Sequence, residues 1–199
     1  MLGVLDEFRN DGVGHRLKLI QRDRTLAMGL DLIEWTYDPM QALNAHLNFA
    51  KLGIVVEEYE LNVYGTSHSP LHGGNPTDRF VSEWKIRDPH VERRLQAAAN
   101  RHAIPVRSQD LVNAERANRL TSAAGWFECV DVRVDLDAPR VLVEIPMGFT
   151  EMLAGAPDLA LAWRMSTREM FTAYFGRGYK AVDFLLDRPA GRGSYLLVA

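Results

Sequence analysis

The 199-residue sequence is short of cysteine, of long hydrophobic runs and of any excess of one charge. Its one cysteine, Cys129, excludes an intrachain disulfide framework and favours a cytoplasmic protein. A formal net charge of −3 gives no general electrostatic reason to bind nucleic acid. No apolar stretch approaches the roughly 18 residues of a membrane span, and the N-terminal segment lacks the apolar run of a signal peptide. We therefore expect neither nucleic acid nor a membrane as a partner.

Hydrophobic periodicity predicts alternating strands and helices over residues 1–88. Strands are expected over residues 2–5, 31–37, 54–64 and 79–86. A helix is expected over residues 12–28, with Gly29 as its C-cap and an apolar face of Val13, Leu17, Ile20 and Ala27. Asp38-Pro39 predicts the start of a second helix that runs to Leu52, with an apolar face of Met40, Leu43, Leu47 and Ala50.

The pattern changes at Asp88-Pro89. Residues 89–139 are expected to form a connector, with a helix over residues 90–103 and a strand over residues 126–135. Residues 140–199 predict a βαββ region, with strands near residues 139–146, 179–186 and 194–198 and a helix over residues 159–175. This region is expected to pack on the same sheet or on a partner. Residues 49–59 and 174–184 are both helix–glycine–strand junctions, which are too common to indicate an internal repeat.

A pair of glycines opens the first expected helix, in the segment FRNDGVGHRL (residues 8–17). A helix N-terminus has unpaired N–H groups and a partial positive charge, and glycines let a ligand approach the backbone, so the segment can cradle a phosphate. A dinucleotide fingerprint would need glycine where Leu17 stands, and a P-loop would need Lys-Ser or Lys-Thr after Gly14. The sequence instead matches Arg-x-x-Gly-x-Gly through Arg9, Gly12 and Gly14.

This pattern resembles the pyrophosphate loop of the GNAT superfamily of acyl-CoA-dependent N-acyltransferases. In that family the next helix ends in a motif that Asn44 and FAKLGI (residues 49–54) match in register. More narrowly, WTYDPMQALNAHLNFAKLG, NVYG, NPTDRFVSEW, VEIP, WR and GY resemble a bacterial family described as predicted GNAT acetyltransferases, over most of the chain. The resemblance implies an α/β (α+β) fold with a mixed, mainly antiparallel sheet flanked by helices.

The resemblance also implies that the GNAT domain is incomplete at the N-terminus. GNAT domains begin with a strand, two helices and two more strands before the pyrophosphate loop, whereas Met1 stands eight residues before Arg9. Residues 1–88 would then be the C-terminal part of a CoA-binding domain. A sheet edge exposed in this way needs a cover, so we expect a homodimer or a strongly rearranged monomer.

The resemblance assigns one set of residues to CoA. Backbone N–H groups of residues 10–15 would hold the pyrophosphate, Arg9 and Arg16 would add charge, and Asn44 would bond to the pantetheine arm. The strand over residues 2–5 would pair with the pantetheine amides and present an N–H group to the thioester carbonyl. The arginines could equally be solvated charge, and Asn44 a plain exposed residue. The full set is Leu2, Val4, Arg9, Asn10, Asp11, Gly12, Val13, Gly14, His15, Arg16 and Asn44.

The implied chemistry is aminolysis of a thioester, in which a base removes a proton from the amine and an acid protonates the thiolate. Many relatives supply the acid from a tyrosine whose position here is Phe49, which has no proton to donate. Tyr37 and Tyr64 are alternative acids, and Glu34 and Asp38 are candidate bases. Each also has a structural interpretation, and Asp38 has one as a helix N-cap.

The polar loop of residues 65–78 lies where relatives shape the amine-acceptor pocket. Asp78 and Arg79 could bind the carboxylate of an amino-acid acceptor or pair with each other. His68 and His72 lack the further ligands and the ordered element that zinc needs, so no metal is expected. Trp35 and Trp84 are expected in the core.

The function expected from the resemblance is acyl-CoA-dependent N-acyl transfer to a small amine or amino acid, with acetyl-CoA or another acyl-CoA as cosubstrate. A non-catalytic CoA-binding or structural module is the alternative, because of Phe49 and the incomplete domain. A GNAT-shaped interaction protein without a ligand is a third possibility.

Overall fold

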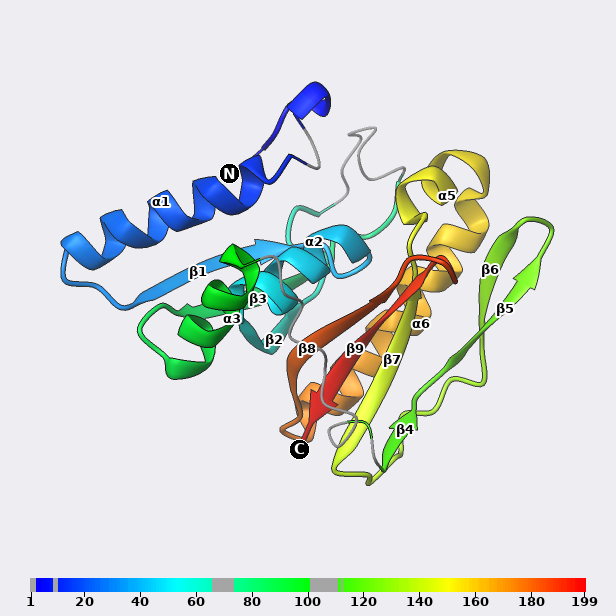
Figure 1. Ribbon diagram of the computed structural model, residues 1–199. Coiled ribbons are helices and arrows are strands. Elements are labelled where there is room, and N and C mark those ends of the chain that lie inside the picture. The colour runs from blue at the N-terminus through cyan, green and yellow to red at the C-terminus, as the bar shows by residue number, and fades with distance from the viewer. Residues whose placement is uncertain (1–2, 9–10, 66–73, 101–110, 112) are drawn as a thin grey trace.

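The computed structural model describes residues 3–8, 11–65, 74–100, 111 and 113–199 (Figure 1). Seven strands form one sheet, and a two-stranded hairpin stands beside it. The order across the sheet is β1 (Leu32–Tyr37), β3 (Arg79–Lys85), β2 (Val55–Glu60), β8 (Lys180–Asp187), β9 (Arg192–Val198), β7 (Arg140–Pro146) and β4 (Ala114–Arg116). The hairpin is formed by β5 (Arg119–Ala123) and β6 (Trp126–Val130). Within the sheet only the β4–β7 pair is parallel, so the expected mixed, mainly antiparallel sheet is confirmed.

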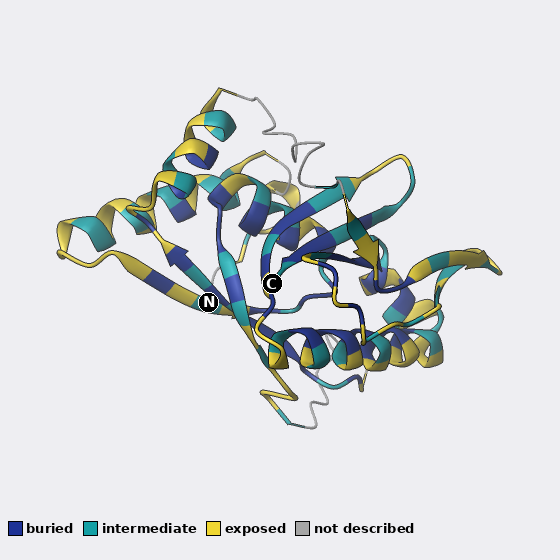
Figure 2. Cartoon of the chain, turned by 90° about the horizontal axis from the view of Figure 1, so that it is seen from below, coloured by how far each residue is buried: buried dark blue, intermediate teal, exposed yellow. Residues whose placement is uncertain are grey.

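Helices cover both faces of this sheet. On one face lie α1 (Val13–Ala27), α2 (Ala42–His46) with its π-helical continuation η2 (Leu47–Leu52), and α3 (Pro89–Ala99). The long helix α6 (Pro157–Gly176) lies on the opposite face, as Figure 2 shows from below. Two short helical segments, η1 (Asp6–Phe8) and α5 (Phe149–Gly155), complete the described helices. None of the described helices is long and apolar enough to cross a membrane.

The sheet consists of two units that meet where β2 lies beside β8, and both units have the same strand topology. One unit runs β1, α2 with η2, β2 and β3, and places β3 between β1 and β2. The other runs β7, α5 with α6, β8 and β9, and places β9 between β7 and β8. Val56 and Ala181 are the one registered pair between the described strands β2 and β8. The two units therefore share a sheet but exchange few backbone hydrogen bonds.

Aromatic side chains fill the space where the two units meet. Phe80 of β3 packs on Tyr195 of β9 and on Phe171 of α6, with ring centres 5.2 and 4.6 Å apart. Phe49 of η2 packs edge-on against Tyr195 at 5.7 Å. Such edge-to-face contacts stabilise the core beyond the apolar area that they bury. The core thus joins residues from the first and second halves of the chain.

Helix α1 forms where periodicity predicts it, but its faces are reversed. Leu17 and Ile20 are 39% and 50% exposed, whereas Lys18 is 7% exposed and faces the sheet. The reversal is possible because the polar side chains on the sheet side have partners. Lys18 lies over the ring of Trp35, and Arg22 donates from Nε and Nη2 to the carbonyl of Ile86 at 3.1 and 2.9 Å.

Two further expectations from the first unit are wrong. Residues 3–5 form no strand, because a strand needs a hydrogen-bonded neighbour and no described strand pairs with them. The second helix begins at Ala42 rather than at Asp38, whose Oδ1 caps a preceding turn by accepting the Met40 N–H at 2.9 Å. Leu43, in the single turn of α2, is exposed rather than buried on the predicted apolar face.

In the rest of the chain most elements agree with expectation. Strands β3, β7, β8 and β9 and helix α6 lie within about two residues of the predicted bounds. Two predicted strands are shorter than expected, since β2 ends at Glu60 and β6 at Val130. Helix α3 ends at Ala99, and residues 101–103 of that prediction lie outside the described residues. The connector region also contributes β4 to the sheet, beside β7.

Candidate functional site

A groove of ≈ 940 Å³ separates helix α1 from strand β1. One wall is α1 and the other is β1, and α2 and η2 close one end. The lining residues are Gly3, Leu17, Lys18, Ile20, Gln21, Arg24, Thr25, Glu34, Trp35, Thr36, Tyr37, Asn44, Leu47, Asn48 and Tyr64. Four residues expected from the sequence to serve the reaction or CoA, Glu34, Tyr37, Asn44 and Tyr64, are thus brought together.

Strand β1 presents a free edge to this groove. It is the first strand of the sheet and pairs with β3, and no described strand lies on its other side. In an antiparallel pair, alternate residues direct their N–H and C=O groups to the outer edge. An extended ligand with amide groups could therefore bond to β1 as an added strand would.

The N-terminus of α1 lies beside Leu47, one of the residues that line this groove. Gly12 precedes the helix with φ 76° and ψ 7°, a left-handed conformation that glycine adopts without strain, and no side chain caps the helix. Its carbonyl accepts the Arg16 N–H at 3.0 Å. A Cβ on Gly14 would lie 3.8 Å from Leu47 Cδ2, and Leu47 lines the groove. Asp11 and Arg16 are exposed at this end, and Val13 is half-buried. Leu2, Arg9 and Asn10, which the sequence also assigned to CoA, lie outside the described residues.

Two side chains near this helix start carry buried nitrogen atoms. His15 is half-buried, and no described residue offers its Nε2 a hydrogen-bond partner. Burial and the nearby positive charge of Lys51 lower the pKa of His15, so its ring is neutral at physiological pH. Asn48 is 1% exposed, and its Nδ2 has no hydrogen-bond partner among the described residues, although Asn48 lines the groove. Sequence reasoning selected Asn44, which is exposed, and missed Asn48 four residues later.

Lys18 is the second lining residue that sequence reasoning missed. Its Nζ lies 3.2 Å from the centre of the Trp35 ring, a cation–π contact. Burial lowers the pKa of Lys18 to about 8. No described carboxylate lies within ion-pair distance of it. A buried cation without an anionic partner is costly, so this position is exceptional in the described chain.

Tyr37 and Tyr64 reach the groove in different ways. The Tyr195 hydroxyl donates to the Pro39 carbonyl at 2.7 Å, so its oxygen accepts from the Tyr37 hydroxyl, 3.5 Å away. Burial raises the pKa of Tyr37 well above its usual value, which keeps the hydroxyl protonated. Tyr64 is 59% exposed, its backbone N–H donates to Thr77 Oγ1, and its ring lies 5.2 Å from the Arg79 guanidinium.

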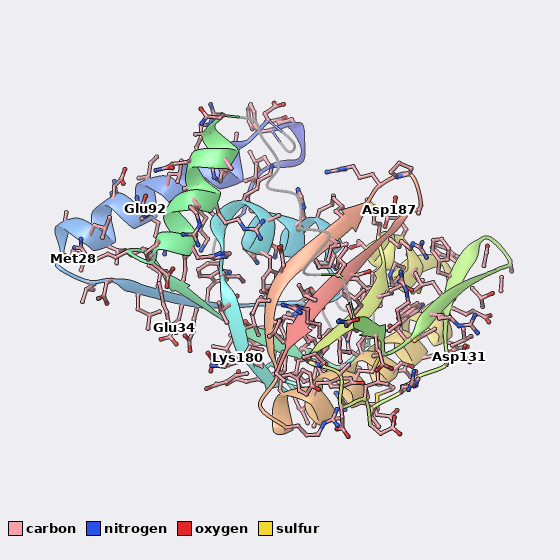
Figure 3. All side chains as sticks on the ribbon, turned by 60° about the horizontal axis from the view of Figure 1, so that its bottom comes forward. Met28, Glu34, Glu92, Asp131, Lys180 and Asp187 are labelled. Carbon is pink, nitrogen blue, oxygen red and sulfur yellow. The ribbon has the colours of Figure 1, made fainter. Side chains whose placement is uncertain are left out.

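Glu34 lies at the rim of the groove. It is exposed, and since side chains alternate along a strand it projects from the face of β1 opposite to Trp35. Figure 3 shows it on the side of β1 that points away from α1. A carboxylate in this place can meet a molecule entering from solvent but lies apart from Lys18, whose ammonium covers the other face.

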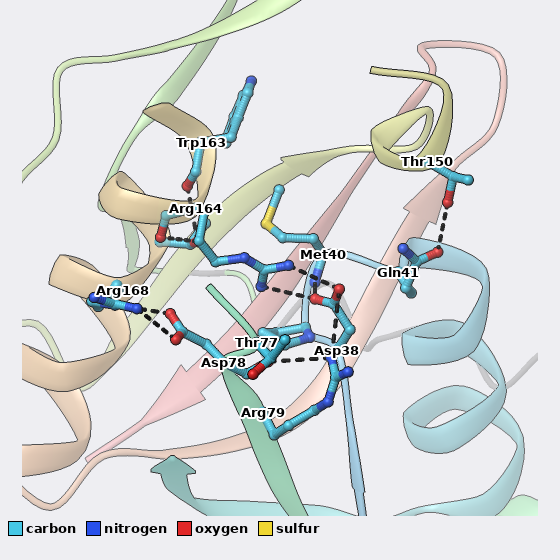
Figure 4. A network of polar contacts seen from close by, with 12 residues as sticks. Asp38, Met40, Gln41, Thr77, Asp78, Arg79, Thr150, Trp163, Arg164 and Arg168 are labelled. Atoms are coloured by element: carbon cyan, nitrogen blue, oxygen red, sulfur yellow. Dashed lines mark hydrogen bonds and ion pairs between the residues drawn. The ribbon is translucent and has the colours of Figure 1, made fainter. Parts of the chain in front are cut away.

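Asp38, Asp78 and Arg79 lie outside the groove, in a buried polar network (Figure 4). Asp38 is paired with Arg164 at 2.8 Å and approached by Arg79 at 3.7 Å. Asp78 accepts hydrogen bonds from Arg168 at 2.7 and 2.9 Å, from the Tyr59 hydroxyl at 2.7 Å and from the Asn62 N–H at 2.9 Å. The side chains of Asp78 and Arg79 therefore pair with other residues rather than with each other.

Phe49 and Trp84 lie in the core at 0% exposure. Trp35 is half-buried and packs against the core. His68 and His72 lie outside the described residues. Within the described ranges, no group of three or more His, Cys, Asp or Glu side chains could hold a metal ion. Comparisons of the chain with protein-family models, with curated proteins and with solved structures find no match.

Proposed function

We propose that the chain is an acyl-CoA-dependent N-acyltransferase of GNAT type, which binds acyl-CoA in the groove between α1 and β1. One observation carries the proposal: a helix that glycine opens forms one wall of a groove, and the opposite wall is a strand edge that no described strand pairs with. The first feature suits a pyrophosphate and the second suits the amides of a pantetheine arm. Their adjacency suits a molecule that contains both.

The pyrophosphate would bind at the start of α1. The first N–H groups of a helix have no intrahelical acceptors and carry the positive end of the helix dipole. No side chain caps α1, and a Cβ on Gly12 would meet nothing within 4 Å, so an anion could approach the backbone there. Arg16, exposed one turn later, would add positive charge.

The pantetheine arm would lie along β1, with Asn44 and Asn48 as hydrogen-bonding side chains at the end of the groove. The thioester would then be reached by an amine entering past the rim. Glu34 would accept the proton of the attacking amine, and Tyr64 would donate one to the leaving thiolate. Tyr37, whose hydroxyl donates to Tyr195, would help to fix the backbone at Pro39.

Calorimetric titration of CoA into the chain tests the binding step. Micromolar binding is expected, with a loss of at least tenfold in Gly14→Glu, since the new carboxylate would stand beside the pyrophosphate. Gly14 has ordinary helical geometry, so this variant should fold. Gly176→Glu is the matched control, because that glycine also lies at a helix end with open space around it. No binding by the folded chain at millimolar CoA would overturn the proposal.

A non-catalytic CoA-binding module is the second candidate, and the burial of Phe49 against Tyr195 favours it. Thiol release from acetyl-CoA with a panel of small amines separates the two candidates. A catalyst should release thiol, and Glu34→Gln should slow it at least tenfold with little change in CoA affinity. Binding without thiol release for any amine would favour the module. The homodimer expected from the resemblance stays a prediction, which sedimentation would test.

A further inference from the structure

We propose that Lys18 and Asn48 form a subsite for a carboxylate group of the substrate. The inference deepens the proposed function, on which it rests for the identity of the molecule that carries the carboxylate. Two sources have the same chemistry: the terminal carboxylate of a dicarboxylic acyl group, and the carboxylate of an amino-acid acceptor.

The first observation is the environment of Lys18. The residue is 7% exposed and lines the groove. Its ammonium lies over the Trp35 ring, which stabilises the charge through a cation–π contact. The three N–H donors of the ammonium have no described carboxylate partner. The other three lysines do not share this combination of burial and contact, because Lys51, Lys85 and Lys180 are all exposed. Lys85 also pairs with Glu83, and Lys180 pairs with Glu57.

The second observation is independent of the first and comes from another element. Asn48 is 1% exposed, at the second position of η2, and in the described part of the chain its Nδ2 lacks a hydrogen-bond partner. A buried amide donor without an acceptor destabilises the fold, so such groups usually have a role. Asn48 lines the same groove as Lys18. Both residues offer donors and both lack acceptors.

A carboxylate supplies what both side chains lack. It has a negative charge for the ammonium and two acceptor oxygens for N–H donors. Among the lining residues Glu34 is the only acid, and it projects from the opposite face of β1. Lys18 and Arg24 give the α1 wall of the groove two basic side chains.

The first experiment needs no CoA. The chain has four lysines, so reductive methylation with ¹³C-formaldehyde gives few NMR signals, and Lys→Arg variants assign them. Succinate at up to 20 mM should raise the titration midpoint of Lys18 by at least one pH unit and leave that of Lys85 unchanged. Asn48→Leu should weaken the response to succinate at least threefold. A Lys18 signal that does not respond to succinate would overturn the proposal.

The second experiment identifies the source. Affinities for acetyl-CoA and succinyl-CoA, and KM values for an amino acid and its decarboxylated amine, are compared in the wild type, Lys18→Met and the surface control Lys85→Met. If the acyl group carries the carboxylate, wild type should prefer succinyl-CoA at least tenfold, and Lys18→Met should lose that preference. If the acceptor carries the carboxylate, wild type should prefer the amino acid over its decarboxylated amine, and Lys18→Met should lose that preference instead. The absence of both preferences in a chain that binds CoA would overturn the inference.

The two proposals can fail separately. A chain that binds no CoA contradicts the proposed function, whereas the NMR response to succinate still decides the subsite. Met has nearly the length of Lys and packs well on an aromatic ring, so Lys18→Met should fold. Circular dichroism and the melting temperature would verify this before affinities are compared.

Discussion

Arg164 forms a bidentate ion pair with Asp38, in which Nη1 donates to Oδ1 and Nη2 donates to Oδ2, each at 2.8 Å. The two residues are 126 positions apart, one at the end of β1 and the other in α6. Arg168, one turn later in α6, binds Asp78 in the same bidentate way. Since β2 and β8 share one registered pair, these ion pairs are specific ties between the two units of the sheet.

We expect Arg164→Met to destabilise the chain by about 3–5 kcal/mol, because it leaves the carboxylate of Asp38 buried without its main partner. Urea unfolding would measure this. Adding Asp38→Asn to Arg164→Met should restore part of the loss, because the charge is then removed too. Arg119→Met is the control: Arg119 and Asp131 form an exposed pair, whose removal should cost less than about 1 kcal/mol. Equal losses in the two single variants would contradict this account.

Asp78 should make the stability depend on pH in the acid range. Burial alone would raise the pKa of this carboxyl, but hydrogen bonds from Arg168, the Asn62 N–H and Tyr59 outweigh it, and the net pKa is lowered. A carboxyl with a lowered folded pKa stabilises the fold above its unfolded pKa of about 3.9, and loses this contribution as the pH falls through the folded pKa.

The melting temperature should therefore fall below about pH 4 more steeply in wild type than in Asp78→Asn. Asp137→Asn, at a side chain that is 98% exposed, should keep the wild-type slope. Parallel curves for wild type and Asp78→Asn would show that this carboxyl is not the source of the acid sensitivity.

Lys18 should also make the stability rise with pH, but in the alkaline range. Burial lowers its pKa in the folded chain to about 8, against about 10.4 for an unfolded lysine. Between these values the unfolded state binds more protons than the folded state, so stability should rise with pH. We expect the free energy of unfolding to increase from pH 8 to 9.5 in wild type but not in Lys18→Met. The buried tyrosines begin to oppose this rise only near pH 10.

A tight contact between β8 and β9 gives a stability test unrelated to charge. A Cβ on Gly193 would lie 2.3 Å from Phe184 Cζ and 3.2 Å from the Leu185 carbonyl oxygen. Phe184 is buried, so its ring has little room to move, and Gly193→Ala should cost about 1–3 kcal/mol. Gly176→Ala, which meets nothing within 4 Å, should be neutral or stabilise by up to about 1 kcal/mol. Chemical unfolding of both variants measures the difference.

The sequence predicted those elements whose apolar pattern is long or strongly alternating, such as α6, β7 and β9. It could not predict which side of α1 faces the sheet, because the choice depends on Trp35 and Ile86, which are distant partners for Lys18 and Arg22. The short strand β4 gave no signal, since three residues are too few for periodicity.

In the candidate site, too, the sequence predicted residues that belong to a local motif and missed residues whose role depends on distant partners. The motif-like stretch around residues 34–44 indicated Glu34, Tyr37 and Asn44, all of which line the groove. Lys18 was missed because a lysine in an amphipathic helix ordinarily faces water. The partners of Asp38 and Asp78 were missed because ion pairs across about 90 residues or more leave no local pattern.

The arrangement of the sheet also constrains how a ribosome can produce this protein. Residues 31–85 emerge first, yet the arginines that neutralise Asp38 and Asp78 belong to α6, at Arg164 and Arg168. Phe80 likewise waits for Phe171 and Tyr195. Translation proceeds at roughly 5–20 residues per second, so for several seconds the first unit exposes carboxylates and aromatic rings that are buried in the native fold. The native packing of the first unit is therefore completed only after α6 and β9 have been synthesised.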